Sequence, residues 1–243
     1  MDKIAVIDYL IPLFFISFFA GIIFLPDIFM RKKAGKLFLP LKENGFQPID
    51  TSQLSIIERV EFKDPSTSQF PFYGKKNRPK ILSALSKKIS PSSTRYILFT
   101  KLRLTKKTFY EIKLIDICKT CISCKISVGE RMHPSLESML APLIKKQYQI
   151  WGLKEIKEGL HRDFIDKFIV MAEDANLRLP ENLQKYLINT CVRQSQTDRP
   201  TLDHLFFSRE GWSLGSHVIN RSKLEQLFEM SDNINEHLTR QST

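Results

Sequence analysis

An uncharged apolar run near the N-terminus constrains this chain more than any other feature. Tyr9 to Leu25 reads YLIPLFFISFFAGIIFL, seventeen residues without a charge. An α-helix rises about 1.5 Å per residue and the hydrocarbon core of a bilayer is about 30 Å thick, so about 17 to 25 apolar residues can cross it. Asp8 and Asp27 flank the run and can reach the two water interfaces. The sequence therefore predicts one transmembrane helix within residues 1–30.

A cleaved signal peptide is the alternative interpretation of this run. Such a peptide needs a basic start, an apolar core of about 7 to 15 residues and a small-residue cleavage site. The start of this chain sets Lys3 against Asp2 and Asp8, and no such cleavage site precedes Arg31. We therefore favour a retained, single-pass anchor.

The orientation of the anchor follows from the basic residues around it. Lys3 alone precedes the run, whereas five basic residues follow it closely: Arg31, Lys32, Lys33, Lys36 and Lys42. Lys and Arg near a span remain on the cytoplasmic side. We therefore expect most of the chain to face the cytoplasm.

The excess positive charge lies in the membrane-proximal part of the chain. Residues 31–110 hold eighteen Lys/Arg and five Asp/Glu, whereas residues 111–243 hold eighteen of each. Lys and Arg close to a membrane surface are attracted to anionic lipid by about 1 kcal/mol each. We therefore expect membrane lipid to be contacted by the basic residues nearest the span, Arg31, Lys32, Lys33 and Lys36. Nucleic acid is not an expected partner, because no RNP-like, zinc-finger or helix-turn-helix pattern accompanies the charge.

The rest of the chain predicts an α+β fold with a mixed, mainly antiparallel sheet and three or so helices. We expect three parts: a transmembrane anchor at residues 1–30, a loop-rich basic juxtamembrane segment at residues 31–94, and an α+β cytoplasmic domain at residues 95–243. Pro and Gly recur between residues 64 and 91 and argue against a long element there, although a helical turn is expected around residues 80–88.

Hydrophobic patterning locates the individual elements. Apolar and charged residues alternate over residues 96–104 and 109–117, which predicts antiparallel strands with one wet face, joined by a turn at residues 105–108. Further strands are expected at residues 55–62, 121–128, 164–171, 205–207 and 213–219. Helices are expected at residues 135–148, from Pro180 through Cys191, and from Ser222, where Glu225 indicates a capping box and Leu224, Leu227 and Phe228 share one face.

Three equally spaced cysteines form the sharpest local pattern. Cys118, Cys121 and Cys124 could begin a zinc or iron–sulfur site, with Cys191 or His133 as the fourth ligand. On a strand, however, Cys118 and Cys124 share one face while Cys121 points to the other, so the three thiols do not converge without a turn. We therefore interpret these residues as small buried side chains, reduced in the cytoplasm, and expect no metal site.

No motif in the chain predicts a catalytic residue or a cofactor site. The tripeptide at residues 161–163 (HRD) matches the catalytic tripeptide of protein kinases, but that motif needs an asparagine five residues after the aspartate, where this chain has Phe168. Trp151 and Trp212 each lie beside a glycine, and we interpret them as structural anchors at turns.

Three stretches of the C-terminal third carry a resemblance: DFIDKFIVMAEDANLRLPENLQKYLINTC, LFFSREGWSLGS and KLEQLFEMSDNI. With them, about residues 130–235 resemble a domain of unknown function in uncharacterised bacterial single-span membrane-anchored proteins. It implies a single span in the bacterial inner membrane and an α+β domain in the cytoplasm. It carries no activity and no catalytic residues.

These observations together predict a membrane-tethered, non-enzymatic interaction module. Its expected partners are membrane lipid, through the basic juxtamembrane segment, and a protein that the sequence does not identify. Two alternatives remain: an enzyme with an unrecognised site acting on a membrane-proximal substrate, and a domain that binds lipid or a small ligand.

Overall fold

The computed structural model describes six stretches of the chain: residues 25–49, 80–104, 107–120, 122–128, 152–193 and 204–239. They belong to two units, residues 1–44 and residues 45–243, which are described separately. In these stretches no helix is both long and apolar enough to cross a bilayer. Apart from Leu25, the expected span at residues 9–25 lies outside the described residues, as do the strand expected at 55–62 and the helix expected at 135–148.

A single helix at residues 25–43 forms the described part of the first unit. Its last turn is closed by Asn44, whose backbone N–H and side-chain amide donate to the carbonyl oxygen of Pro40 at 3.2 and 2.9 Å. The expected loop-rich character is therefore wrong for residues 31–43. A glycine inside a helix costs only about 1 kcal/mol, so Gly35 is tolerated, and Pro40 falls close to the helix end.

The second unit is built on one sheet of nine strands, ordered β1-β2-β3-β4-β9-β8-β5-β7-β6. Every strand pairing in the described sheet is antiparallel, so the α+β prediction is confirmed and the sheet is antiparallel rather than mixed. The strands are β1 (Gln47–Pro48), β2 (Lys80–Ser90), β3 (Ser93–Leu104), β4 (Lys107–Ile117), β5 (Cys124–Val128), β6 (Lys154–Ile156), β7 (Phe168–Ala172), β8 (His204–Ser208) and β9 (Gly211–Ser216).

Strands β2, β3 and β4 form a long meander. The β3–β4 pair confirms the hairpin expected from alternation, and Leu104 opposite Lys107 closes it. The helical turn expected at residues 80–88 is wrong, because β2 occupies this stretch. Its sequence KILSALSKKIS has little β-branched character, but pairing with β3 along its length overrides local preference and buries Leu85. The domain boundary expected at residue 95 falls inside this meander.

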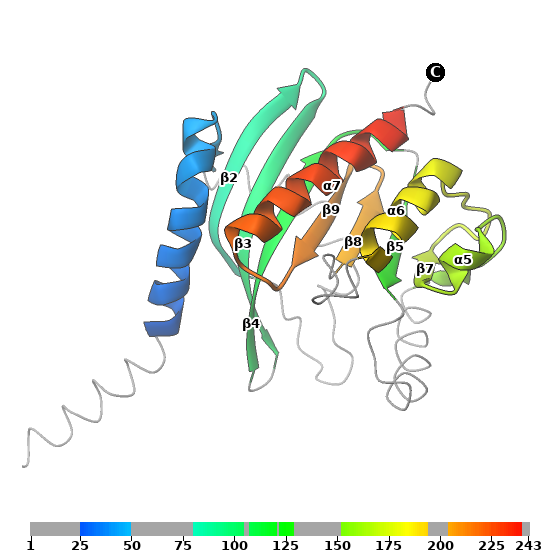
Figure 1. The fold of residues 1–243 in the computed structure, drawn as a ribbon, viewed down its shortest axis with the longest axis horizontal. Coiled ribbons are helices and arrows are strands. Elements are labelled where there is room, and N and C mark those ends of the chain that lie inside the picture. The colour runs from blue at the N-terminus through cyan, green and yellow to red at the C-terminus, as the bar shows by residue number, and fades with distance from the viewer. Residues whose placement is uncertain are drawn as a thin grey trace, which may run out of the picture. The chain divides into compact units, whose positions relative to one another are not determined.

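Three helices cover one face of the sheet (Figure 1). α7 (Arg221–Thr239) contacts β4 and β9, α6 (Glu181–Arg193) contacts α7, and α5 (Arg162–Ile165) contacts α6 and β7. The strand register places a row of fully buried apolar side chains under these helices: Ile97, Leu114, Leu214, Leu205 and Ile126. This row is the centre of the core.

The strand expected at residues 164–171 is shorter than predicted, because a short helix occupies its first part. Residues 162–165 form the short helix α5, and the strand β7 begins only at Phe168. The rings of Phe164 and Phe168 stack with their centroids 4.5 Å apart, and both side chains are buried. Residues four apart lie on the same side of a helical turn, whereas on a strand they would be about 13 Å apart. Burial of both rings therefore favours the turn.

Of the two long helices, α6 begins as the sequence predicts and α7 begins with a different capping residue. α6 follows Pro180, as expected. In α7 the side-chain oxygen of Asn220 accepts a hydrogen bond from the backbone N–H of Lys223 at 2.7 Å, so the capping residue is Asn220 and not Ser222. Glu225 pairs with Arg221 at 2.8 Å instead of completing a capping box.

The C-terminal hairpin β8–β9 lies in the middle of the sheet, between β4 and β5. Gly211 begins β9 opposite Ile117, with a φ of +152°. A Cβ atom at this position would overlap the backbone carbonyl oxygen of Asp116. The backbones of β4 and β9 therefore approach each other too closely for residue 211 to carry a side chain.

The Gly211→Ala substitution should destabilise the second unit strongly. Overlap with the β4 backbone and an unfavourable φ should together lower the free energy of unfolding by about 3 kcal/mol or more. Gly152→Ala is the matched control, because Gly152 has a φ of +77° but no atom within 4 Å of the place that a Cβ would take, so only about 1 to 2 kcal/mol should be lost. Thermal unfolding followed by tryptophan fluorescence measures both, and equal losses would contradict the close approach at Gly211.

Candidate functional site

The residues expected to contact lipid all lie on the helix of residues 25–43. Arg31, Lys32, Lys33 and Lys36 are exposed, as is Lys42 further along. The helix therefore brings together, within a little more than one turn, the four basic side chains that the sequence singled out.

The turn that precedes these basic residues exposes three large apolar side chains, with Asp27 among them in sequence. The exposed fractions of Leu25, Ile28 and Phe29 are 63%, 49% and 67%. Arg31 follows Leu25 by six residues, which is about 9 Å along a helix axis. Exposed apolar side chains are thus followed directly by exposed basic ones. Side chains occur in this order where a transmembrane helix emerges from the lipid into water.

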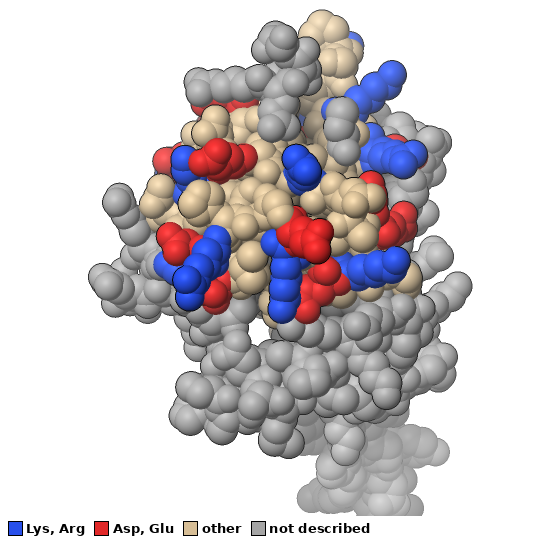
Figure 2. Space-filling model, turned by 90° about the vertical axis from the view of Figure 1, so that its right-hand side faces the viewer, with Lys and Arg blue, Asp and Glu red and all other residues tan. Residues whose placement is uncertain are grey.

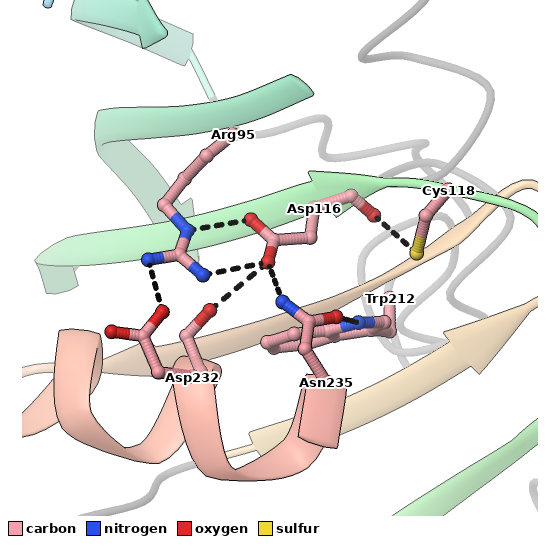
Figure 3. Close-up of polar contacts among 7 residues, drawn as sticks. Arg95, Asp116, Cys118, Trp212, Asp232 and Asn235 are labelled. Carbon is pink, nitrogen blue, oxygen red and sulfur yellow. Dashed lines mark hydrogen bonds and ion pairs between the residues drawn. The ribbon is translucent and has the colours of Figure 1, made fainter. Parts of the chain in front are cut away.

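A buried ion pair joins β3 to β4 beneath α7 (Figure 3). Nε and Nη2 of Arg95 donate to the two carboxylate oxygens of Asp116, each at 2.9 Å. Arg95 is 5% exposed and Asp116 is fully buried. The two residues are opposite each other in the β3–β4 ladder, so backbone pairing sets the side-by-side geometry of the two charged groups.

Asp116 also connects the sheet to α7. Its Oδ2 accepts hydrogen bonds from the hydroxyl of Ser231 at 3.0 Å and the amide of Asn235 at 2.7 Å. The indole N–H of Trp212 in turn donates to the amide oxygen of Asn235 at 3.2 Å. Trp212 is fully buried, in agreement with its interpretation as a structural anchor. We refer to Arg95, Asp116, Trp212, Ser231 and Asn235 as the Asp116 cluster.

Arg95 reaches a second carboxylate at the edge of the cluster. Its Nη1 lies 2.8 Å from Asp232, whose side chain is 68% exposed, and its guanidinium lies 5.6 Å from the ring centre of Phe228. Burial alone lowers the pKa of Arg95, but the hydrogen bond and charge of Asp116, with a contribution from Asp232, raise it overall. The donors and acceptors of the cluster are directed at one another, so its arrangement is that of a structural connection between sheet and helix.

Two of the three cysteines that the sequence grouped, Cys118 and Cys124, are described, and they lie on different elements of the sheet. Cys118 follows β4 and is half-buried, with its thiol 3.9 Å from the carbonyl oxygen of Asp116, whereas Cys124 is buried within β5. Cys121 and His133 lie outside the described residues, and so does the side chain of Cys191. In the part of the chain that the structure describes, no three His, Cys, Asp or Glu residues are grouped as metal ligands.

Polar side chains are also buried on the sheet face opposite the helices. They are Thr100, Glu111, Lys113, Lys125 and Ser213, none more than 9% exposed. Nζ of Lys113 lies 3.5 Å from Oε2 of Glu111. The expected wet face is therefore wrong at these positions. Alternation along a strand reports the polarity of side chains and not whether another part of the chain covers them.

A shallow pocket of about 560 Å³ lies beside the start of α6, where the sequence indicated no site. Its lining comes from two separate segments of the chain, which explains why no local motif pointed to it. Figure 2 views the molecule from the side on which α5 and α6 lie in Figure 1. The lining residues are Gly159, Leu160, His161, Arg162, Arg178, Leu179, Glu181 and Gln184.

Comparison of the chain with protein-family models, with curated protein sequences and with solved structures finds no match in any of the three. The resemblance of residues 130–235 to bacterial membrane-anchored proteins therefore stays a prediction.

The Asp116→Asn substitution should destabilise the second unit, because it leaves Arg95 buried beside a neutral group. Loss of one partner from a buried ion pair costs about 3 to 5 kcal/mol. Asp232→Asn removes the exposed partner of the same arginine and should cost less than about 1 kcal/mol. Chemical denaturation of the two variants measures the difference, and similar losses would show that the Asp116 cluster is not the main connection.

Cys118 should react slowly with alkylating reagents while the protein is folded. Burial and the nearby charge of Asp116 raise the pKa of this thiol to about 11, an effect that the hydrogen bond from Trp212 offsets only in part. Only the thiolate reacts, so at pH 8 about one thiol in a thousand is reactive, against roughly a quarter for an ordinary cysteine. Iodoacetamide labelling resolved by peptide mass spectrometry should therefore be at least about 100-fold slower before unfolding than after it. Equal rates would contradict a raised pKa.

Proposed function

We propose that this chain is a membrane-tethered, non-enzymatic interaction module. In this proposal residues 9–25 cross a bacterial inner membrane, and the helix of residues 25–43 continues from that span on the cytoplasmic side. The basic side chains of the helix contact anionic lipid, and the second unit meets a protein partner close to the membrane surface.

The observation that carries the proposal is the passage from apolar to basic side chains along the described helix. Leu25, Ile28 and Phe29 are exposed directly before Arg31, although exposed large apolar residues in water are unfavourable. Leu25 ends the uncharged run of the sequence, and Ile28 and Phe29 follow it just beyond Asp27, so the edge of a lipid bilayer is the surrounding that would stabilise them.

The distances along the helix suit an electrostatic contact with the membrane surface. Arg31 and Lys36 are five residues apart, about 8 Å along the axis, which is close to the Debye length of about 8 Å at physiological salt. The attraction of each basic residue falls off over this length, so the four together contribute at most about 4 kcal/mol. Residues 111–243 carry equal numbers of acidic and basic side chains and add no net attraction, whereas residues 45–110 hold thirteen Lys/Arg and four Asp/Glu and can add to that of the helix.

The Asp116 cluster offers no group that could act as a general acid or base. A general acid or base has to reach a substrate within hydrogen-bond distance. The carboxylate of Asp116 is buried, and it already accepts hydrogen bonds from Arg95, Ser231 and Asn235. The enzyme alternative therefore gains no support from this cluster.

Lysine reactivity tests the lipid contact on the full chain. The protein is reconstituted in phosphatidylcholine vesicles with and without phosphatidylglycerol, and the acylation rate of each lysine is followed by mass spectrometry. Lys32, Lys33 and Lys36 should react severalfold more slowly in the anionic vesicles, and high salt should remove the difference because it screens the surface charge. Lys157, which is 60% exposed on the second unit, is the control and should react equally in both.

Two results would contradict this proposal separately. Equal acylation rates of the three lysines in neutral and anionic vesicles would exclude the lipid contact. Release of the full chain from native membranes by alkaline carbonate would exclude the membrane span, whatever the lysine rates show.

A further inference from the structure

The pocket beside α6 has a preformed floor. Gln184 is 2% exposed and connects the two segments that line the pocket. Its Oε1 accepts a hydrogen bond from the backbone N–H of His161 at 2.7 Å, and its Nε2 donates to the carbonyl oxygen of Leu179 at 2.9 Å. Since both ends of the buried amide are bonded, the segments at residues 159–162 and 178–181 are held together at a set spacing.

Two arginines in this pocket carry charge that no carboxylate neutralises. Arg162 and Arg178 are exposed and both line the pocket, and within the described stretches neither has an ion-pair partner. The stem of Arg178 lies over Gly159, where a Cβ atom would come within 3.6 Å of its Cγ. That distance is an ordinary van der Waals contact, so the glycine is favoured here by its φ of +74° and not by lack of space.

The acidic residue of the lining is engaged elsewhere. Glu181 pairs with Lys185, one helical turn further along α6, and lies 3.8 Å from Nε2 of His161. The hydrogen bond and charge of Lys185 lower the pKa of Glu181, so its carboxylate remains ionised and paired. The two guanidinium groups thus remain the uncompensated charges of the pocket.

The surface around the pocket favours a compact anion over an extended acidic chain. Residues 152–193 hold seven Lys/Arg and seven Asp/Glu. Figure 2 shows the two signs interspersed over the described surface, without a patch of one sign. An extended acidic segment would therefore meet as many like charges as opposite ones. A single compact group bound in the pocket that both arginines line avoids this repulsion.

We propose that the pocket formed by Gly159, Arg162, Arg178 and the Gln184-linked segments binds the phosphate group of a phosphate monoester. Each guanidinium can donate two parallel hydrogen bonds to phosphate oxygens, and two guanidinium charges match a phosphate dianion. A volume of about 560 Å³ exceeds that of the phosphate itself and leaves room for an attached organic group. The phosphate could come from a soluble metabolite or from a lipid headgroup. This site is separate from the lipid-contacting helix, so it stands or fails independently of the proposed function.

Calorimetric titration of the full chain in a nonionic detergent tests the site, with inorganic phosphate and glycerol 3-phosphate as probes at constant ionic strength. We expect saturable binding of both, and Arg162→Gln and Arg178→Gln should each weaken it at least about tenfold, because each removes charge-assisted hydrogen bonds. Arg209→Gln is the matched control, since Arg209 is exposed in the β8–β9 turn and does not line the pocket. Circular dichroism checks that each variant remains folded.

Three outcomes would overturn the proposal: no saturable binding to the native protein, equal binding by the Arg162→Gln and Arg178→Gln variants, or equal weakening by Arg209→Gln. The source of the phosphate is decided by repeating the titration in phosphatidylcholine nanodiscs with and without phosphatidic acid. Competition by phosphatidic acid would assign the site to a lipid headgroup. Unchanged binding of glycerol 3-phosphate would assign it to a soluble ligand, and both results uphold the site.

Discussion

The packing of the second unit depends on the ion pair and the hydrogen bonds that the carboxylate of Asp116 makes. It lies on β4, is bonded to Arg95 on β3, and accepts hydrogen bonds from Ser231 and Asn235 on α7. A buried carboxylate is costly to remove from water and is stable only when several donors surround it. The position of α7 and its register on the sheet are thereby restricted, since a shift of α7 would leave this charge without its donors. The close passage of Gly211 beside Asp116 adds a steric restriction at the same point.

Both units carry a positive net charge, and most of it lies in the second unit. Residues 1–44 hold six Lys/Arg and four Asp/Glu, whereas residues 45–243 hold thirty-one and twenty-two. Within the second unit the excess lies in residues 45–110, because residues 111–243 hold eighteen of each. The close grouping of four exposed basic side chains at residues 31–36, and not net charge, therefore distinguishes the helix of residues 25–43. Residues 152–193 hold seven Lys/Arg and seven Asp/Glu, so recognition there rests on local arrangements such as the two arginines of the pocket.

Most of the strands and the two long helices of the described chain could be predicted from local patterns. The β3–β4 hairpin follows from alternation of apolar and charged residues, and α6 from Pro180 and the spacing of Leu183 and Leu187. β2 could not be predicted, because its sequence suits a helix as well as a strand and its pairing with β3 decides the outcome. The pocket could not be predicted either, since Arg162 and Arg178 are sixteen residues apart and the segments that carry them are joined by the buried amide of Gln184.

The sequence by itself determined the α+β class, the uncharged run at residues 9–25 and the basic residues that follow it, because these properties depend on the order of residues alone. Only the tertiary structure decided which charged residues are buried. Arg95 and Asp116 look like solvent-facing positions of alternating strands, yet they are enclosed, since α7 returns over the sheet from more than 100 residues further along the chain. Burial depends on what covers a side chain, and that covering segment is distant in sequence.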